Sequence, residues 1–69
     1  MESTGNRIKA RRAVLGLSRS ALAQRLGTTR MTVWRVENGK QKIPSDDLPV
    51  WAVALETKAA DLVPAELVA

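Results

Sequence analysis

Cysteine and histidine are both absent from the 69 residues. Their absence excludes disulfide bonds and the thiolate and imidazole metal sites that stabilise many small proteins, so we expect no metal and no cofactor. It also removes the usual nucleophile and proton shuttle, and no two acidic residues stand at an obvious catalytic spacing. An enzyme is therefore not expected.

Long apolar segments are missing as well. No apolar run approaches the roughly 20 residues that a membrane-spanning helix needs, and nothing resembles a signal peptide. No repeat, low-complexity segment or long linker divides the chain, whose length is near the lower limit for a domain without disulfides or metals. We expect one domain over residues 1–69 that is cytoplasmic, with neither a membrane nor a small molecule as its partner.

The basic residues are unevenly distributed. Residues 1–42 carry ten of the eleven basic residues and two acidic ones, a net charge of +8, whereas residues 43–69 carry one basic residue and five acidic ones, a net charge of −4. A strongly basic surface suits a polyanion, and nucleic acid is the first candidate. The alternative is a basic surface that is only solvated.

Strand signals are absent, and apolar periodicity with Gly- and Pro-marked turns predicts short helices. Ser18 and Thr29 are expected to cap the second and third helices, and Pro64 is expected to end the last one. The expected helices span about residues 5–15, 19–26, 30–38, 46–55 and 59–63, followed by a short tail over residues 64–69.

Residues 18–38 have the pattern of a helix-turn-helix. Ala23 is small at the point where the second and third helices should cross closely, and Gly27 supplies the positive φ of a tight turn. Apolar contacts between the two helices are expected from Leu22, Leu26, Val33 and Val36. Any pair of packed helices would need a similar pattern, so this geometry alone does not decide the function.

From Arg7 to about Leu62 the chain resembles helix-turn-helix domains of the Xre/Cro type, especially the repressors and Cro proteins of lambdoid phages. The matching segments are RRAVLGLSRSALAQRLGTT, ENGK and LPVWAVAL, within about four-fifths of the chain. The resemblance implies an all-α, compact five-helix lambda-repressor-like domain, a recognition helix in the major groove, and usually a homodimer on an inverted repeat. The phage relatives carry glutamines along the recognition helix, where this chain has arginines and a methionine, so no operator sequence carries over.

The third helix has two distinct sides at about 100° per residue. Thr29, Val33 and Val36 fall on the side expected to pack. The other side carries Arg30, Met31, Trp34, Arg35 and Asn38.

We expect base contacts from the first four residues of that outer side. Arg30 and Arg35 can each donate two hydrogen bonds to guanine, and Met31 can cover a thymine methyl; one of the two arginines could hold a phosphate instead. Trp34 could reach a thymine methyl, a sugar or a phosphate, or fold back on the domain. Ordinary core or dimer packing is the alternative for Met31 and Trp34.

Phosphate contacts are expected at both ends of the recognition helix, where they would position it without choosing a sequence. The start of the second helix, the turn, and the segment after the third helix provide the donors. The expected residues are Arg19, Thr28, Thr29, Asn38, Lys40 and Lys42. A weaker contribution is expected from Arg7, Lys9 and Arg11.

Arg12 and Glu37 are expected to form a buried ion pair. Arg12 shares the apolar stripe of the first helix, and Glu37 is the only acidic residue between Glu2 and Asp46. Each would be costly to bury alone, and the family resemblance implies the same pair. Removing either partner should cost on the order of 3–5 kcal/mol.

The acidic segment should lie away from DNA or against another protein. Because relatives dimerise through the corresponding regions, the resemblance implies a dimer interface that includes Ile43, Pro44, Ala59 and Leu62. Two recognition helices of such a dimer would read half-sites about 34–36 Å apart.

The sequence therefore predicts a sequence-specific regulator of transcription that binds double-stranded DNA, with a homodimeric repressor as the first expectation. Such a protein would be at the nucleoid when bound to DNA. Antitoxins and restriction-modification controllers share this domain and are not separated from it. Two other classes remain open: a protein-interaction module anchored by Met31 and Trp34, and a protein that coats nucleic acid without sequence preference.

Overall fold

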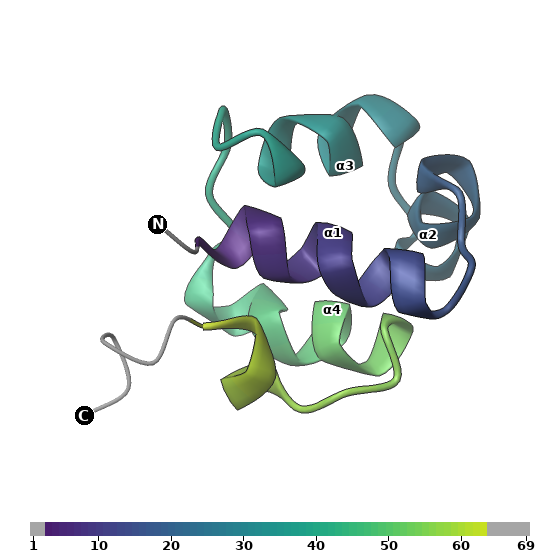
Figure 1. Ribbon diagram of the computed structural model, residues 1–69. Helices are drawn as coiled ribbons and strands as arrows, with labels where there is room; N and C mark the ends of the chain where they lie inside the picture. The colour runs from purple at the N-terminus through teal and green to yellow at the C-terminus, as the bar shows by residue number, and fades with distance from the viewer. Residues whose placement is uncertain (1–2, 64–69) are drawn as a thin grey trace.

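The computed structural model describes residues 3–63, which contain four α-helices, two short 3-10 helices and no β-strand (Figure 1). The elements are α1 (Thr4–Val14), α2 (Arg19–Leu26), α3 (Arg30–Glu37), η1 (Ser45–Asp47), α4 (Leu48–Ala54) and η2 (Ala59–Leu62). The all-helical prediction is confirmed. The expected tail over residues 64–69 lies outside the described residues.

The expectation of five α-helices is wrong. The fifth helix is η2, a single 3-10 turn of four residues that ends at Leu62 and is followed by Val63 with φ −106° and ψ 130°. That extended conformation is the one that a residue before proline prefers, so Pro64 ends the helix after one turn. The fourth helix also begins later than expected, because residues 45–47 form η1 and the α-helical conformation starts at Leu48, next to Pro49.

Local signals set the boundaries of the helix-turn-helix. The hydroxyl of Ser18 accepts from the backbone N–H of Ala21 at 3.0 Å, and that of Thr29 accepts from Thr32 at 3.2 Å. These bonds satisfy donors that the first turn of a helix leaves unpaired. Gly27 ends α2 with φ 69°, a left-handed conformation that glycine adopts without steric cost. Both predicted caps are confirmed.

Helix α1 crosses the middle of the molecule between α3 on one side and α4 with η2 on the other, and α2 packs against both α3 and α4 at one end (Figure 1). The apolar sides of all these elements meet in one core. Its buried residues are Ile8, Leu22, Ala23, Val33, Val36, Trp51, Ala52, Ala54, Leu55 and Leu62. Within residues 3–63 no helix has the length and apolar content of a membrane span.

The start of α1 lies directly against the end of α3. A Cβ atom at Gly5 would overlap the backbone carbonyl oxygens of Val36 and Glu37. Only glycine permits this approach, and it holds the C-terminal end of α3 against α1. The orientation of α3 is therefore fixed by backbone contact as well as by side-chain packing.

Candidate nucleic-acid interface

Helix α3 buries one side and exposes the other, as its periodicity predicts. Val33 and Val36 are 0% and 4% exposed, whereas Met31 and Trp34 are 54% and 41% exposed. Trp34 therefore does not fold back into the core. Thr29, which was expected on the packing side, is exposed, because its hydroxyl is turned to the backbone of Thr32 to cap the helix.

The arginines divide into two groups. Arg30 and Arg35 are exposed and have no hydrogen-bond or ion-pair partner among the described residues. The other five all bond to the protein itself. These are Arg7, Arg11, Arg12, Arg19 and Arg25. Most of the arginines therefore bond within the protein, and the two that remain available to a ligand, Arg30 and Arg35, lie on the outer side of α3.

Glu37 is bound by two arginines. Its side chain is completely buried, and it accepts from Nε of Arg12 at 2.6 Å and from Nε of Arg19 at 3.0 Å. Arg12 also donates from Nη2 to the other carboxylate oxygen at 3.2 Å and from Nη1 to the carbonyl of Leu17 at 2.9 Å. The structure contains the expected Arg12–Glu37 pair, and it ties α1 and the start of α2 to the end of α3.

The second partner, Arg19, was expected only as a phosphate contact. Its side chain is 32% exposed, so part of the guanidinium still reaches the surface while Nε is held by Glu37. A signal for this shared role was present in the sequence, since Glu37 is the only acidic residue in residues 3–45. A single buried carboxylate in a segment rich in arginine can accept from more than one of them.

Arg7 and Arg11 do not contribute to this surface, which corrects the expectation of a third basic patch. Arg11 donates to the carbonyls of Leu55 and Glu56 at 3.0 and 2.9 Å. Arg7 donates to the carbonyl of Asp61 at 3.2 Å. Both acceptor segments lie across α1 from α3 (Figure 1). Lys9 of α1 remains exposed.

The remaining expected phosphate contacts lie at the two ends of α3. Thr28 and Thr29 are exposed in the turn before it, and Lys40 and Lys42 are exposed in the segment after it. Asn38 is exposed too, but its side-chain amide donates to the carbonyl of Trp34 at 2.8 Å. That bond satisfies a carbonyl at the end of the helix, so the Asn38 amide is already partly occupied.

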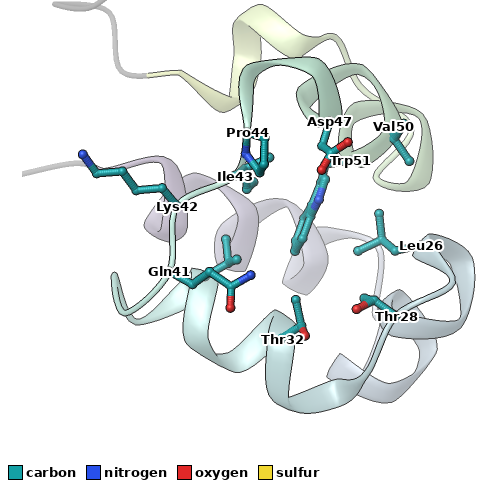
Figure 2. Close-up of a pocket in the computed structure, with 11 residues that line it drawn as sticks. Leu26, Thr28, Thr32, Gln41, Lys42, Ile43, Pro44, Asp47, Val50 and Trp51 are labelled. Carbon is teal, nitrogen blue, oxygen red and sulfur yellow. The ribbon is translucent and has the colours of Figure 1, made fainter.

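A recess separates the helix-turn-helix from the start of α4 (Figure 2). Thr28 and Thr32 line it from one side and Lys42 from the other, with Trp51 of α4 between them. Figure 2 shows the Lys42 side chain directed away from the two threonines, so the structure does not bring together Thr28 and Lys42, which were both expected to contact phosphates. Gln41 also lines the recess; it was not predicted, although it lies between Lys40 and Lys42.

The expected dimer residues differ in exposure. Pro44 is exposed, whereas Ile43 and Ala59 are partly buried against the core. Leu62 is 1% exposed and belongs to the core itself. The expectation of a dimer contact through the Leu62 side chain is therefore wrong, because η2 turns that side chain inward onto α1 and α4.

The acidic side of the molecule carries one perturbed carboxyl group. Asp61 accepts from the hydroxyl of Thr57 at 2.7 Å and from the backbone N–H of Lys58 at 3.3 Å. These bonds favour the charged form, so they lower the pKa of Asp61 below its ordinary value of 3.8, with the Thr57 bond as the main cause. The end of the molecule across α1 from α3 therefore stays negative.

The helix-turn-helix domain family matches residues 4–65. The chain belongs to this family. Among solved structures, the restriction-modification controller protein C.AhdI from Aeromonas hydrophila is 30% identical, with a TM-score of 0.80 over 86% of this chain and 89% of that one. The resemblance to the Xre/Cro type is confirmed.

Two other similar structures define how far this likeness extends. The DNA-binding domain of the P22 c2 repressor is 24% identical, with a TM-score of 0.84 over 88% of this chain and 80% of that one, which shows the fold. Hydroxypropylphosphonic acid epoxidase from S. wedmorenis is 32% identical over 88% of this chain but only 32% of its own length, with a TM-score of 0.83. The likeness covers only that 32% of the epoxidase, so it does not extend to the activity of the enzyme. The family and the controller protein support a DNA-binding regulator of transcription and not an enzyme.

Proposed function

We propose that this protein is a sequence-specific repressor of transcription that binds double-stranded DNA through the major groove, as a homodimer on an inverted repeat. The observation that carries the proposal is the division of the arginines. Five are bound within the protein, and the two without a partner among the described residues, Arg30 and Arg35, share the outer side of α3. Unpaired guanidinium groups on a helix that fits the major groove are suited to guanine edges.

The base-contacting residues of this proposal are Arg30, Met31, Trp34 and Arg35. The arginines would donate to O6 and N7 of guanine, which is the commonest specific contact to DNA. Val33 and Val36 hold the opposite side of α3 in the core, and the bond of Glu37 to two arginines holds its end. The reading side chains therefore project from a rigid element, which favours discrimination between bases.

The phosphate-contacting residues would flank α3 and set its register on the duplex. Thr28 and Thr29 are exposed before the helix, and Lys40 and Lys42 are exposed after it. Arg19 would reach a phosphate with the part of its guanidinium that Glu37 does not bind, and Asn38 would contribute its exposed side chain. These contacts release counterions, so they make binding strongly salt-dependent.

Dimerisation would place two copies of α3 on one face of the duplex. Pro44 is the exposed member of the expected interface, whereas Ile43 and Ala59 are partly exposed. The segment after residue 42 carries negative charge that suits a protein contact better than DNA. A two-fold axis would align the copies with half-sites about 34–36 Å apart. Among similar structures, the P22 c2 repressor was determined in complex with a synthetic operator, which supports DNA binding by this fold.

The test is selection of bound duplexes from a randomised library, followed by sequencing, at two salt concentrations. We expect an enriched inverted repeat whose half-site centres lie about 10 base pairs apart. Salt-sensitive binding without enrichment would show general coating of nucleic acid. No binding at either salt concentration would refute DNA binding and favour a protein-interaction module.

A matched pair of variants distinguishes the effect of the outer side of α3 on binding from the effect of total charge. Arg30→Ala and Lys58→Ala each remove one positive charge, but Lys58 is exposed at the start of η2, across α1 from α3. We expect Arg30→Ala to lose the enriched sequence and Lys58→Ala to select the same sequence as the unchanged protein. Equal losses in both variants would contradict the role of α3.

A further inference from the structure

The recess between the helix-turn-helix and the start of α4 is large enough for a small molecule. It encloses about 340 Å³, within the range of roughly 300–1,000 Å³ that ligand sites occupy. Leu26, Ile43 and Val50 line it with apolar groups, and Trp51 and Asp47 line it with polar ones. Such a combination of apolar surface with a few polar groups is what a small molecule needs for affinity and for a fixed orientation.

Trp51 brings a hydrogen-bond donor without a partner to this recess. The residue is only 7% exposed, yet its indole N–H has no acceptor among the described residues. The Nε1 atom keeps contact with solvent, and Figure 2 shows the ring in the middle of the recess, between Ile43 and Leu26. Because a buried indole N–H usually has a hydrogen-bond partner, the partner of this one must come from solvent or from a ligand.

An acceptor lies at the same end of the recess. Asp47 precedes Trp51 by four residues, so the two side chains lie on the same side of the helix, and Figure 2 shows the carboxylate next to the indole ring. This carboxylate makes no hydrogen bond or ion pair within residues 3–63. A ligand that bonds to both side chains must therefore present an acceptor and a donor on one edge.

A cis amide has such an edge. In the usual trans amide the C=O and N–H groups point in opposite directions, whereas in the cis form they point the same way. Open-chain amides strongly disfavour the cis form, so the group is expected within a ring, as in a lactam. An anionic ligand fits less well, because the carboxylate of Asp47 would repel it and Lys42 is directed away from the threonines of the recess (Figure 2).

We propose that this recess binds a small apolar ring that contains a cis amide. The indole N–H of Trp51 donates to the carbonyl oxygen of the ligand, and the N–H of the ligand donates to the carboxylate of Asp47. The remaining ring atoms pack against Leu26, Ile43 and Val50. This inference goes beyond the proposed function and does not require DNA binding. It also revises the expectation of no small-molecule partner, since the lining residues come from several elements and form no short sequence pattern.

The experiment titrates ε-caprolactam into the isotope-labelled protein and follows the indole N–H signals by NMR. The chain has two tryptophans, and the variant Trp34→Phe identifies the signal of Trp51. We expect this signal to move downfield as its N–H forms a hydrogen bond, while the signal of Trp34 stays in place. The expected dissociation constant is on the order of 1 mM, which is usual for so small a ligand.

N-Methylcaprolactam is the matched ligand control. It keeps the ring and the carbonyl group but has no N–H to donate to Asp47. We expect it to bind about fivefold more weakly than caprolactam, the equivalent of ~1 kcal/mol for one hydrogen bond. Its carbonyl should still move the Trp51 signal downfield.

Two variants assign the donor contact to one carboxylate. Asp46→Ala and Asp47→Ala each remove an exposed carboxylate from η1, but of the two only Asp47 lines the recess. The side chain of Asp47 makes no capping bond to α4, so its removal should leave the fold intact. We expect Asp47→Ala to bind both lactams with the same affinity, and Asp46→Ala to keep the fivefold preference for caprolactam.

The outcomes separate this site from its alternatives. A Trp51 signal that caprolactam does not move, or equal binding of the two lactams by the unchanged protein, would overturn the proposal. If Asp47→Ala moved that signal in the free protein and caprolactam did not, Asp47 itself would be the acceptor. A signal that moves with protein concentration alone would assign the recess to a second copy. Each measurement is made without DNA, so these results leave the proposed function untouched.

Discussion

Two arginines of α3 and two that lie near the end of α4, Arg11 of α1 and Arg25 of α2, have the same side chain but different partners. Arg30 and Arg35 are without a partner among the described residues, whereas Arg11 and Arg25 donate to the backbone carbonyls of residues 54–56 at 2.9 to 3.0 Å. A net charge of +8 over residues 1–42 therefore overstates the surface that is available to a polyanion. The residues to consider for binding are those whose charge the fold leaves without a partner.

The helices also end in different ways. Helices α1, α2 and α3 are followed by glycines with φ of 68°, 69° and 71°, whereas α4 is followed by Glu56 with φ 56°. The last carbonyls of a helix lack intrahelical partners and carry partial negative charge. At α4 the guanidinium groups of Arg11 and Arg25 stabilise these carbonyls, and Arg25 also pairs with Glu56 at 2.9 Å. Arg11 and Arg25 therefore stabilise the folded structure.

The largest effect is expected where two arginines share one buried carboxylate. Glu37→Gln keeps the side-chain volume but removes the charge that Arg12 and Arg19 both contact. We expect unfolding free energy to fall by about 3 kcal/mol, because breaking a buried ion pair leaves uncompensated charge. Urea denaturation followed by circular dichroism measures it.

The exposed carboxylate of Glu56 provides the control for that variant. Its side chain is 58% exposed and pairs with Arg25. Glu56→Gln should change the free energy of unfolding by less than about 1 kcal/mol. Similar losses in the two variants would contradict the structural role assigned to Glu37.

The next largest effect is expected to distinguish the exposed arginines of α3 from the arginines that bond within the protein. Arg35→Ala should weaken specific DNA binding by about 1–3 kcal/mol, with little change in stability, because it removes a base contact. Arg11→Ala should do the reverse, costing about 1–2 kcal/mol of stability through its two lost carbonyl bonds while the bound sequence stays the same. Fluorescence anisotropy and thermal unfolding on both variants measure the two quantities. Similar losses of DNA affinity and of stability in the two variants would contradict the different roles assigned to Arg35 and Arg11.

A smaller effect distinguishes phosphate contacts from base contacts. Lys40→Ala should weaken binding to all sequences and lower the slope of log K against log salt by about 0.9, the value for one lost phosphate contact. The same titration on Lys58→Ala should leave the slope unchanged, since Lys58 directly precedes η2, which lies across α1 from α3 (Figure 1). A lower slope in the control would show that overall charge governs binding.

The smallest effect concerns the negative end of the molecule. The pKa of Asp61 is lowered in the folded protein, so its contribution to stability is present above the ordinary pKa of 3.8 and is lost as pH falls through the lower, folded value. Asp61→Asn should therefore flatten the fall in stability on acidification below about pH 4 and leave DNA binding at neutral pH unchanged. Thermal unfolding between pH 2 and 7 checks this; an unaltered acid transition would exclude the role of Asp61.

Much of the helix-turn-helix could be predicted from the sequence because its signals are local. The hydroxyls of Ser18 and Thr29 cap helices through bonds to residues three positions later, and Gly27 ends α2 through its own backbone conformation. The periodicity of α3 alone separates Val33 and Val36 from Met31 and Trp34. Each of these features depends on a few consecutive residues, so the amino-acid order is enough to determine it.

The partners of the arginines could not be predicted in this way. Arg11 and Leu55 are 44 residues apart, Arg25 and Ala54 are 29 apart, and Arg19 and Glu37 are 18 apart. No short pattern indicates which of several similar guanidinium groups will meet a given carbonyl or carboxylate. The same limit explains Leu62, whose apolar side chain is as suitable for a dimer contact as for the core that it enters.

By itself, the sequence determined the helical class, the capped helix-turn-helix, the two sides of α3 and the excess of positive charge before residue 43, because composition and helical periodicity are properties of the chain alone. Only the tertiary structure decided which positive charges remain for DNA. Packing α1 and α2 against α3, α4 and η2 brings five arginines to acceptors within the protein. It leaves Arg30 and Arg35, on the outer side of α3, without a partner among the described residues.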